Sequence, residues 1–199
     1  MKRYEISSTI PAPHFIGAWV LEPTDICDDL ITFFENHTAK QKQGEFSSGI
    51  DPLLKKSIDI TIKPKDLKLK GYQAFSSYME KLLLCYQDYR EQWPFLSKYL
   101  NQVHIGAFNL QRYHKGDHYN AVHSERMGLA SSHKLFAWMT YLNDVDDGGE
   151  TEFPHFGISV KPKKGTTLIW PSEWTHAHSG NTLNAGSKYI ITGGMHFPE

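Results

Sequence analysis

Near residue 100 the hydrophobic pattern of this 199-residue chain changes from helical spacing to short runs typical of strands. Beyond that point, short apolar or alternating runs are separated by turn signals rich in glycine and aspartate. These runs cover residues 103–113, 134–142, 157–160, 166–170 and 188–197. Several short strands at this spacing favour an all-β sandwich or barrel. We therefore predict an all-β core in the second half of the chain.

The first hundred residues show mainly helical periodicity. Apolar side chains between Ile26 and Phe34 recur at offsets of three and four, and Thr24 is the candidate N-cap of that helix. A second helix is predicted from about Gly71 to Trp93, where a following proline ends it.

Between the two predicted helices, the polar stretch 38–48 is expected to form a loop. Residues 57–62 alternate polar and apolar side chains, which predicts a strand. We find no repeat or linker, and the length is sufficient to bury a core without disulfides or metals. The chain is thus predicted to be a single domain, 1–199. In it, a helical support layer with a strand (1–100) packs on the β core (103–199).

Composition narrows the class of protein. The formal net charge is −1, which argues against a protein that coats nucleic acid or binds a membrane surface. The two cysteines, Cys27 and Cys85, lack the spacing of metal ligands and suit a reducing compartment. The first residues have no apolar signal-peptide core, and no apolar run reaches 18 residues. A soluble cytoplasmic protein is expected.

A His-x-Glu pair is the first candidate site. If His123 and Glu125 share a strand, both side chains point to the same face of the sheet. A histidine from a distant strand would complete a set of two histidines and one carboxylate, which is the signature of non-haem Fe(II) oxygenases. By itself His-x-Glu is a weak motif, and it also fits a pair of surface strand residues.

Four ordered sequence blocks surround that pair. They are the pattern Y-x-x-G-x-x-Y-x-x-x-H-x-E (113–125), the segment 141–145, the segment GGETEFP (148–154), and GTTLIWP followed by His178, Lys188 and Thr192 (165–192). The sequence from about 103 to 197 resembles the prolyl 4-hydroxylase-like branch of the 2-oxoglutarate- and Fe(II)-dependent oxygenases. It is especially similar to small microbial and phage members. The ten-residue step from His178 to Lys188 is part of that resemblance.

The resemblance implies a double-stranded β-helix, a jelly-roll barrel with the metal in its mouth. Iron would be held by His123, Glu125 and His178. Carried over in the same way, Lys188 would pair with the distal carboxylate of 2-oxoglutarate, because a buried dianion must be neutralised. The resemblance also assigns Thr192 to that carboxylate, on the same strand face as Lys188, and it assigns Tyr113 and Tyr141 to the wall of the cosubstrate pocket.

Two points stay open in this assignment. The usual acidic ligand of the family is aspartate, and Glu125 adds one methylene that moves the ligand oxygen unless the backbone retreats. His176 competes with His178, because strand alternation would give both the same face. The spacing to Lys188 favours His178, which leaves His176 beside the site or on its rim. Trp170 and Trp174 are assigned to core and pocket wall.

The activity implied is hydroxylation of an unactivated C–H bond by O2, coupled to decarboxylation of 2-oxoglutarate to succinate and CO2. The cofactors would be Fe(II) and 2-oxoglutarate, with ascorbate as a candidate reductant. The substrate would be a prolyl or other residue in a peptide or protein, and a free amino acid or small metabolite is the alternative. The loop 126–133, rich in small residues, is a candidate flap over that substrate. A non-catalytic metal-binding barrel and a cupin-like enzyme without 2-oxoglutarate are the rival interpretations.

Overall fold

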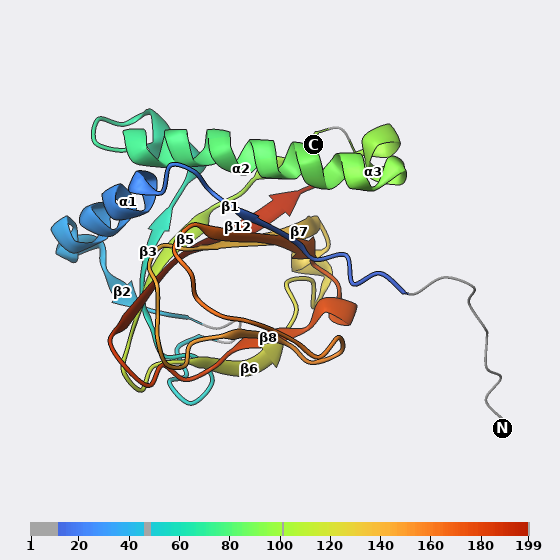
Figure 1. The fold of residues 1–199 in the computed structure, drawn as a ribbon. Coiled ribbons are helices and arrows are strands. Elements are labelled where there is room, and N and C mark those ends of the chain that lie inside the picture. Colours follow the sequence, from blue (N-terminus) through green and yellow to red (C-terminus); the bar gives the residue numbers. More distant parts are fainter. Residues whose placement is uncertain (1–11, 46–48, 101, 199) are drawn as a thin grey trace, which may run out of the picture.

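Two antiparallel β-sheets face each other, and helices cover the outer face of the larger sheet (Figure 1). This arrangement comes from a computed structural model that describes residues 12–45, 49–100 and 102–198. The large sheet consists, in spatial order, of β1 (Gly17–Val20), β10 (Thr166–Pro171), β7 (Lys134–Tyr141), β12 (Ser187–His196), β5 (Phe108–His114), β3 (Ile58–Ile62) and β2 (Lys42–Gln43), with β4 (His104–Ile105) also paired to β12. The small sheet has the order β6 (Tyr119–His123), β11 (His178–Gly180), β8 (Thr151–Phe153) and β9 (Ile158–Val160).

The helical layer forms where the sequence has helical spacing. Helix α1 (Asp25–Asn36) and helix α2 (Gln73–Gln92) bury their apolar faces against each other and the large sheet. Thr24 lies at the N-cap of α1 as predicted, although its side chain makes no capping hydrogen bond. Pro94 ends α2 and also begins the short helix α3 (Pro94–Tyr99), because its fixed φ suits the first helical position.

Two cores stabilise the molecule. The larger core lies between the helices and the large sheet, and the smaller core lies between the two sheets. Phe75 of α2 illustrates the larger core, since its ring contacts Phe33 of α1 and Phe108 of β5 at centroid distances of 4.8 and 6.0 Å. The helices therefore support the outer face of the sheet whose inner face is available for a site.

Replacing Phe75 with alanine should lower the free energy of unfolding by about 3–5 kcal/mol, because a fully buried ring leaves a cavity between helix and sheet. Urea unfolding at equilibrium measures the effect. Leu84→Ala, on the same helix but 64% exposed, is the matched control and should change stability by less than about 0.5 kcal/mol. Equal effects of the two substitutions would contradict this packing.

The structure corrects the sequence prediction at several places. The predicted loop 38–48 contains a 3-10 turn, η1 (Thr38–Lys40), and strand β2, while residues 46–48 lie outside the described residues. The predicted run 103–113 forms two strands, because the extended pairing is interrupted between the end of β4 and the start of β5. The short strands β1, β8 and β11 are too brief to carry a visible alternation.

The predicted flap, 126–133, carries a short 3-10 turn, η3 (Leu129–Ser131). The remaining 3-10 turns are η2 (Pro64–Lys68) and η4 (Trp174–His176). Among the described residues, every helix is too short or too polar to cross a membrane. The start of the chain, on which the signal-peptide prediction was based, includes residues 1–11, which lie outside the described residues.

Candidate metal and cosubstrate site

The two candidate histidine ligands are brought together by strand pairing. Strands β6 and β11 are antiparallel neighbours in the small sheet, and their register places His178 directly opposite His123. Both side chains are buried, and their ring centroids are 4.4 Å apart. The pairing thus joins two histidines that are 55 positions apart in the sequence.

Glu125 reaches the histidines by a different route from the predicted one. Strand β6 ends at His123, so Glu125 lies two residues past the strand and not at an alternating position within it. The chain after it is held by the backbone N–H of Arg126, which donates to the carbonyl of Ser172 at 2.9 Å. The His-x-Glu pair therefore converges because the chain turns at the strand end.

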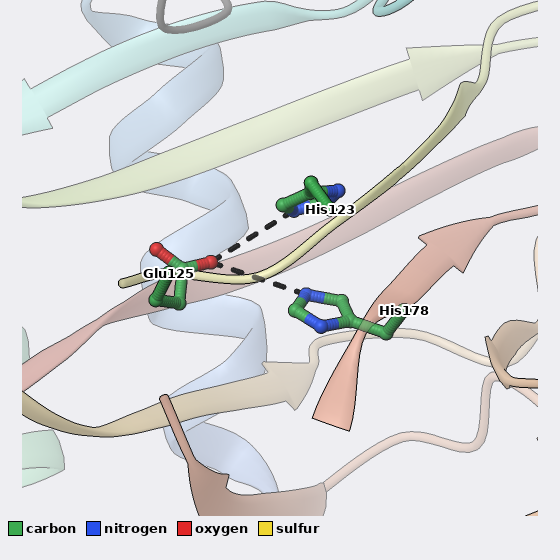
Figure 2. A group of neighbouring side chains, drawn as sticks. All are labelled: His123, Glu125 and His178. Atoms are coloured by element: carbon green, nitrogen blue, oxygen red, sulfur yellow. Dashed lines mark ion pairs between the residues drawn. The ribbon is translucent and has the colours of Figure 1, made fainter. Parts of the chain in front are cut away.

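One carboxylate oxygen of Glu125 faces both rings (Figure 2). Its Oε1 lies 3.8 Å from Nε2 of His123 and 3.9 Å from Nε2 of His178. One ligand atom from each of the three residues lies within 4.8 Å of the others. These separations suit donors arranged around a common metal ion.

The other nitrogen of each ring fixes the histidine tautomer. Nδ1 of His123 lies 2.8 Å from the carbonyl of Ala121, and Nδ1 of His178 lies 3.0 Å from the carbonyl of His176. A carbonyl only accepts, so each Nδ1 carries the hydrogen and each Nε2 is the lone-pair nitrogen turned toward Glu125. Burial lowers the pKa of His123 and lowers that of His178 to about 4, which keeps both rings neutral near pH 7.

The donor set fits Fe(II). Two neutral imidazoles and one carboxylate are the ligands of the facial triad, which leaves positions on the metal for other molecules. Burial would raise the pKa of Glu125, but the charge of Lys134 and its hydrogen bond lower it, so the carboxylate is ionised. Lys134 Nζ lies 3.1 Å from Oε2, the oxygen that does not face the rings.

A cavity of about 420 Å³ between the two sheets contains this cluster, and Lys188 lies on its wall. Lys188 is 4% exposed, its Nζ donates to the carbonyl of Gly149 at 2.9 Å, and it lies 4.5 Å from the ring centre of Tyr113. Gly149 has a φ of +75°, which glycine adopts readily, and a Cβ there would lie 3.1 Å from the Lys188 side chain.

No carboxylate among the described residues pairs with Lys188, whereas the second buried lysine of the cavity, Lys55, pairs with Asp59 at 2.8 Å. Burial lowers the pKa of Lys188 to about 8, so it is still mostly protonated at pH 7. The cavity therefore holds one buried ammonium without a carboxylate partner, which suits an anionic ligand.

The other predicted cosubstrate residues differ in position. Tyr113 and Thr192 line the cavity, and Thr192 Oγ1 donates to the carbonyl of Trp138 at 2.9 Å. Tyr141 lies behind the wall: its hydroxyl is 2.6 Å from Oγ1 of Thr151, which does line the cavity. Direct contact of Tyr113, Tyr141 and Thr192 with a cosubstrate stays a prediction.

His176 does not share a face with His178. It ends the turn η4, and its Nε2 lies 2.8 Å from the carbonyl of His14, away from the triad. Its own carbonyl orients His178, as described above. Trp170 is buried on the cavity wall as predicted, but the assignment of Trp174 to core or wall was wrong, since its side chain is 69% exposed.

Sequence reasoning missed several residues that line the cavity. Tyr119 stacks on the ring of His123 at a centroid distance of 4.0 Å, and its place in the 113–125 pattern was a usable signal. Lys55 and Lys134 gave no such signal, because each looks like an ordinary lysine beside a strand. His196 also lies on the wall, from the far end of β12.

Residues 108–196 match the model of the 2OG-Fe(II) oxygenase superfamily, and this range includes the whole small sheet together with β5, β7, β10 and β12 of the large sheet. Over this range, 89 of its 199 residues, the chain is similar to that superfamily. The chain is also prolyl 4-hydroxylase-like, since it is 30% identical to the probable prolyl 4-hydroxylase 9 of Arabidopsis thaliana over 115 residues. That alignment covers 45% of the chain and 40% of the plant protein, so the chain spans less than half the length of this relative.

Solved structures show the same fold. A viral collagen prolyl hydroxylase from Paramecium bursaria Chlorella virus-1 has a TM-score of 0.64 at 17% identity, covering 93% of this chain and 97% of its own. A Trichoplax adhaerens prolyl hydroxylase has a TM-score of 0.69 at 14% identity, covering 92% and 84%. The two-sheet core of this chain is therefore the double-stranded β-helix that the resemblance implied. The match to the superfamily model and the cluster of His123, Glu125 and His178 together imply Fe(II) and 2-oxoglutarate as cofactors.

Proposed function

We propose that the chain is a 2-oxoglutarate-dependent Fe(II) hydroxylase. In this proposal it hydroxylates an unactivated C–H bond of a prolyl or other residue in a peptide or protein, and it converts 2-oxoglutarate to succinate and CO2. The observation that carries the proposal is one cavity that contains both the cluster of His123, Glu125 and His178 and the buried ammonium of Lys188, which forms no ion pair with a carboxylate of the described residues. A peptide substrate is supported by the Trichoplax hydroxylase, whose structure is a complex with a peptide fragment.

Each group has a defined task in this proposal. His123, Glu125 and His178 hold Fe(II), which supplies the O2 chemistry when bound. Lys188 neutralises the distal carboxylate of 2-oxoglutarate in the buried site, and Thr192 and Tyr113 border it. The surrounding walls exclude water, and the chain orients the substrate at the mouth. A free amino acid is the alternative substrate.

An anaerobic titration with Fe(II) and then 2-oxoglutarate tests the proposal. Chelation of 2-oxoglutarate by the metal should produce a visible charge-transfer absorption, and admitting O2 should yield succinate. Proline-containing peptides and pools of free amino acids should then be compared for extra succinate and a hydroxylated product. Absence of both the absorption and succinate would refute the enzyme and leave a non-catalytic metal-binding barrel.

The affinity for 2-oxoglutarate should fall as the pH rises through about 8. The ligand needs the protonated form of Lys188, whose pKa in the empty site is about 8, so a loss of about tenfold is expected between pH 7 and pH 9. Calorimetry with Mn(II) in place of Fe(II), without O2, measures this. Lys188→Arg stays charged at both pH values and should remove the dependence. A wild-type affinity that is flat across this range would contradict the assigned role of Lys188.

A further inference from the structure

The geometry points to Lys134 as a positioning residue that makes Glu125 a one-oxygen metal ligand in place of the usual aspartate. This inference rests on the proposed function, because it concerns how the proposed iron site is held. It starts from the different contacts of the two carboxylate oxygens of Glu125. Oε1 faces the two histidines, while Oε2 lies 3.1 Å from Nζ of Lys134.

Lys134 is itself held in place by the residue that follows Glu125. The guanidinium of Arg126 donates to the carbonyl of Lys134, through Nε at 2.8 Å and also through Nη2. The same guanidinium pairs with Glu173. Together these contacts close the loop 126–133 at its base and fix the first residue of β7 beside the carboxylate.

The backbone at Glu125 is also fixed. Arg126 N–H donates to Ser172, so the chain cannot move freely toward the histidines. Glutamate is one methylene longer than aspartate, about 1.5 Å, so its carboxylate reaches farther from a chain that has already left the strand. The added methylene also adds a rotatable bond, and the ion pair with Lys134 restricts it.

A one-oxygen ligand matters because a carboxylate that chelates through both oxygens would occupy an additional position on the metal. With Oε2 engaged by an ammonium, Glu125 presents Oε1 alone, as the facial triad requires. Lys134 thereby explains how this site can use glutamate where the resemblance leads one to expect aspartate.

The direction in which metal affinity changes when Lys134 is replaced distinguishes a positioning role from a purely electrostatic one. A lysine near a metal repels it, so removing the charge should tighten metal binding if proximity is all that matters. If Lys134 positions the ligand, its removal should weaken binding by about 10–100-fold, as loss of partners of metal ligands does. Mn(II) affinity of Lys134→Met, measured without O2 and without substrate, gives this direction.

The absorption spectrum of bound Co(II) reports the geometry of the metal ligands, and a general loss of protein stability would not change it in the folded protein. The ligand-field bands of folded Lys134→Met should differ from wild type, and Lys134→Arg, which keeps a cation, should restore part of the affinity and spectrum. Lys164→Met is the matched control, because Lys164 also pairs with a carboxylate, Asp28 at 2.7 Å, outside the cavity. It should behave as wild type.

Unchanged or tighter Mn(II) binding by Lys134→Met, with an unchanged Co(II) spectrum, would overturn the positioning role. Failure of the wild-type protein to bind Mn(II), Co(II) or Fe(II) would instead refute the proposed function. The two failures are therefore distinguishable.

Discussion

Glu125→Ala is expected to weaken Fe(II) binding by more than 100-fold and to abolish succinate formation. The substitution removes the only carboxylate in the candidate ligand cluster and leaves Lys134 facing the metal position without its counter-ion. Loss of a direct ligand should exceed the 10–100-fold effect of losing a group that supports a ligand. Anaerobic metal titration and a succinate assay measure the two effects.

Two further substitutions make this test specific. Glu125→Asp should keep part of the activity, because a carboxylate remains but cannot reach both the metal and Lys134 from the same backbone. Glu35→Ala is the control, since Glu35 is also held by a cation, Arg112 at 2.9 Å, but lies on α1 outside the cavity. Full activity in both Glu125 variants would exclude Glu125 from the metal site.

Lys188→Ala should raise the dissociation constant for 2-oxoglutarate by 30-fold or more while leaving metal affinity in its absence nearly unchanged. The buried carboxylate of the ligand would lose its charged partner, and such a loss costs about 2–5 kcal/mol. Titration of the Mn(II)-loaded protein with 2-oxoglutarate, without O2, measures the change. An equal loss of metal affinity would indicate general damage to the site.

The matched control for Lys188 is Lys56→Ala. Lys56 is exposed and pairs with Asp117 at 2.8 Å, outside the cavity wall. Its removal should leave the 2-oxoglutarate dissociation constant within about twofold of wild type, because Lys56 does not line the cavity. If both variants lost cosubstrate affinity equally, the specific role of Lys188 would be refuted.

The fold could be predicted from sequence where periodicity was long enough to show it. The spacing between Ile26 and Phe34 predicted α1, and the alternation at 57–62 predicted β3. Strand β11 could not be predicted in this way, because its three residues give no period and its pairing with β6 is a tertiary contact. Membership of β1, β2 and β3 in the large sheet was likewise invisible to local patterns.

The candidate site was predicted in a similar, uneven way. His123, Glu125 and His178 come together as expected, although Glu125 does so from beyond the strand and His176 points elsewhere. Lys134 could not be found from sequence, because its relation to Glu125 depends on how Arg126 closes the intervening loop. In the sequence alone, a lysine that contacts a metal-ligating side chain cannot be distinguished from a surface lysine.

The proposed ligand anchors are divided between the two sheets. The histidines come from the small sheet, while Lys188 comes from β12 of the large sheet, and Phe153 of β8 packs on Trp170 of β10 between them at 5.4 Å. A metal and cosubstrate held by the histidines of one sheet and by Lys188 of the other would connect the two sheets across the cavity. The spacing between the layers would then set chelate geometry, so the packing of Phe153 and Trp170, which also contact the ring of His178, would tune how tightly the metal and cosubstrate are held.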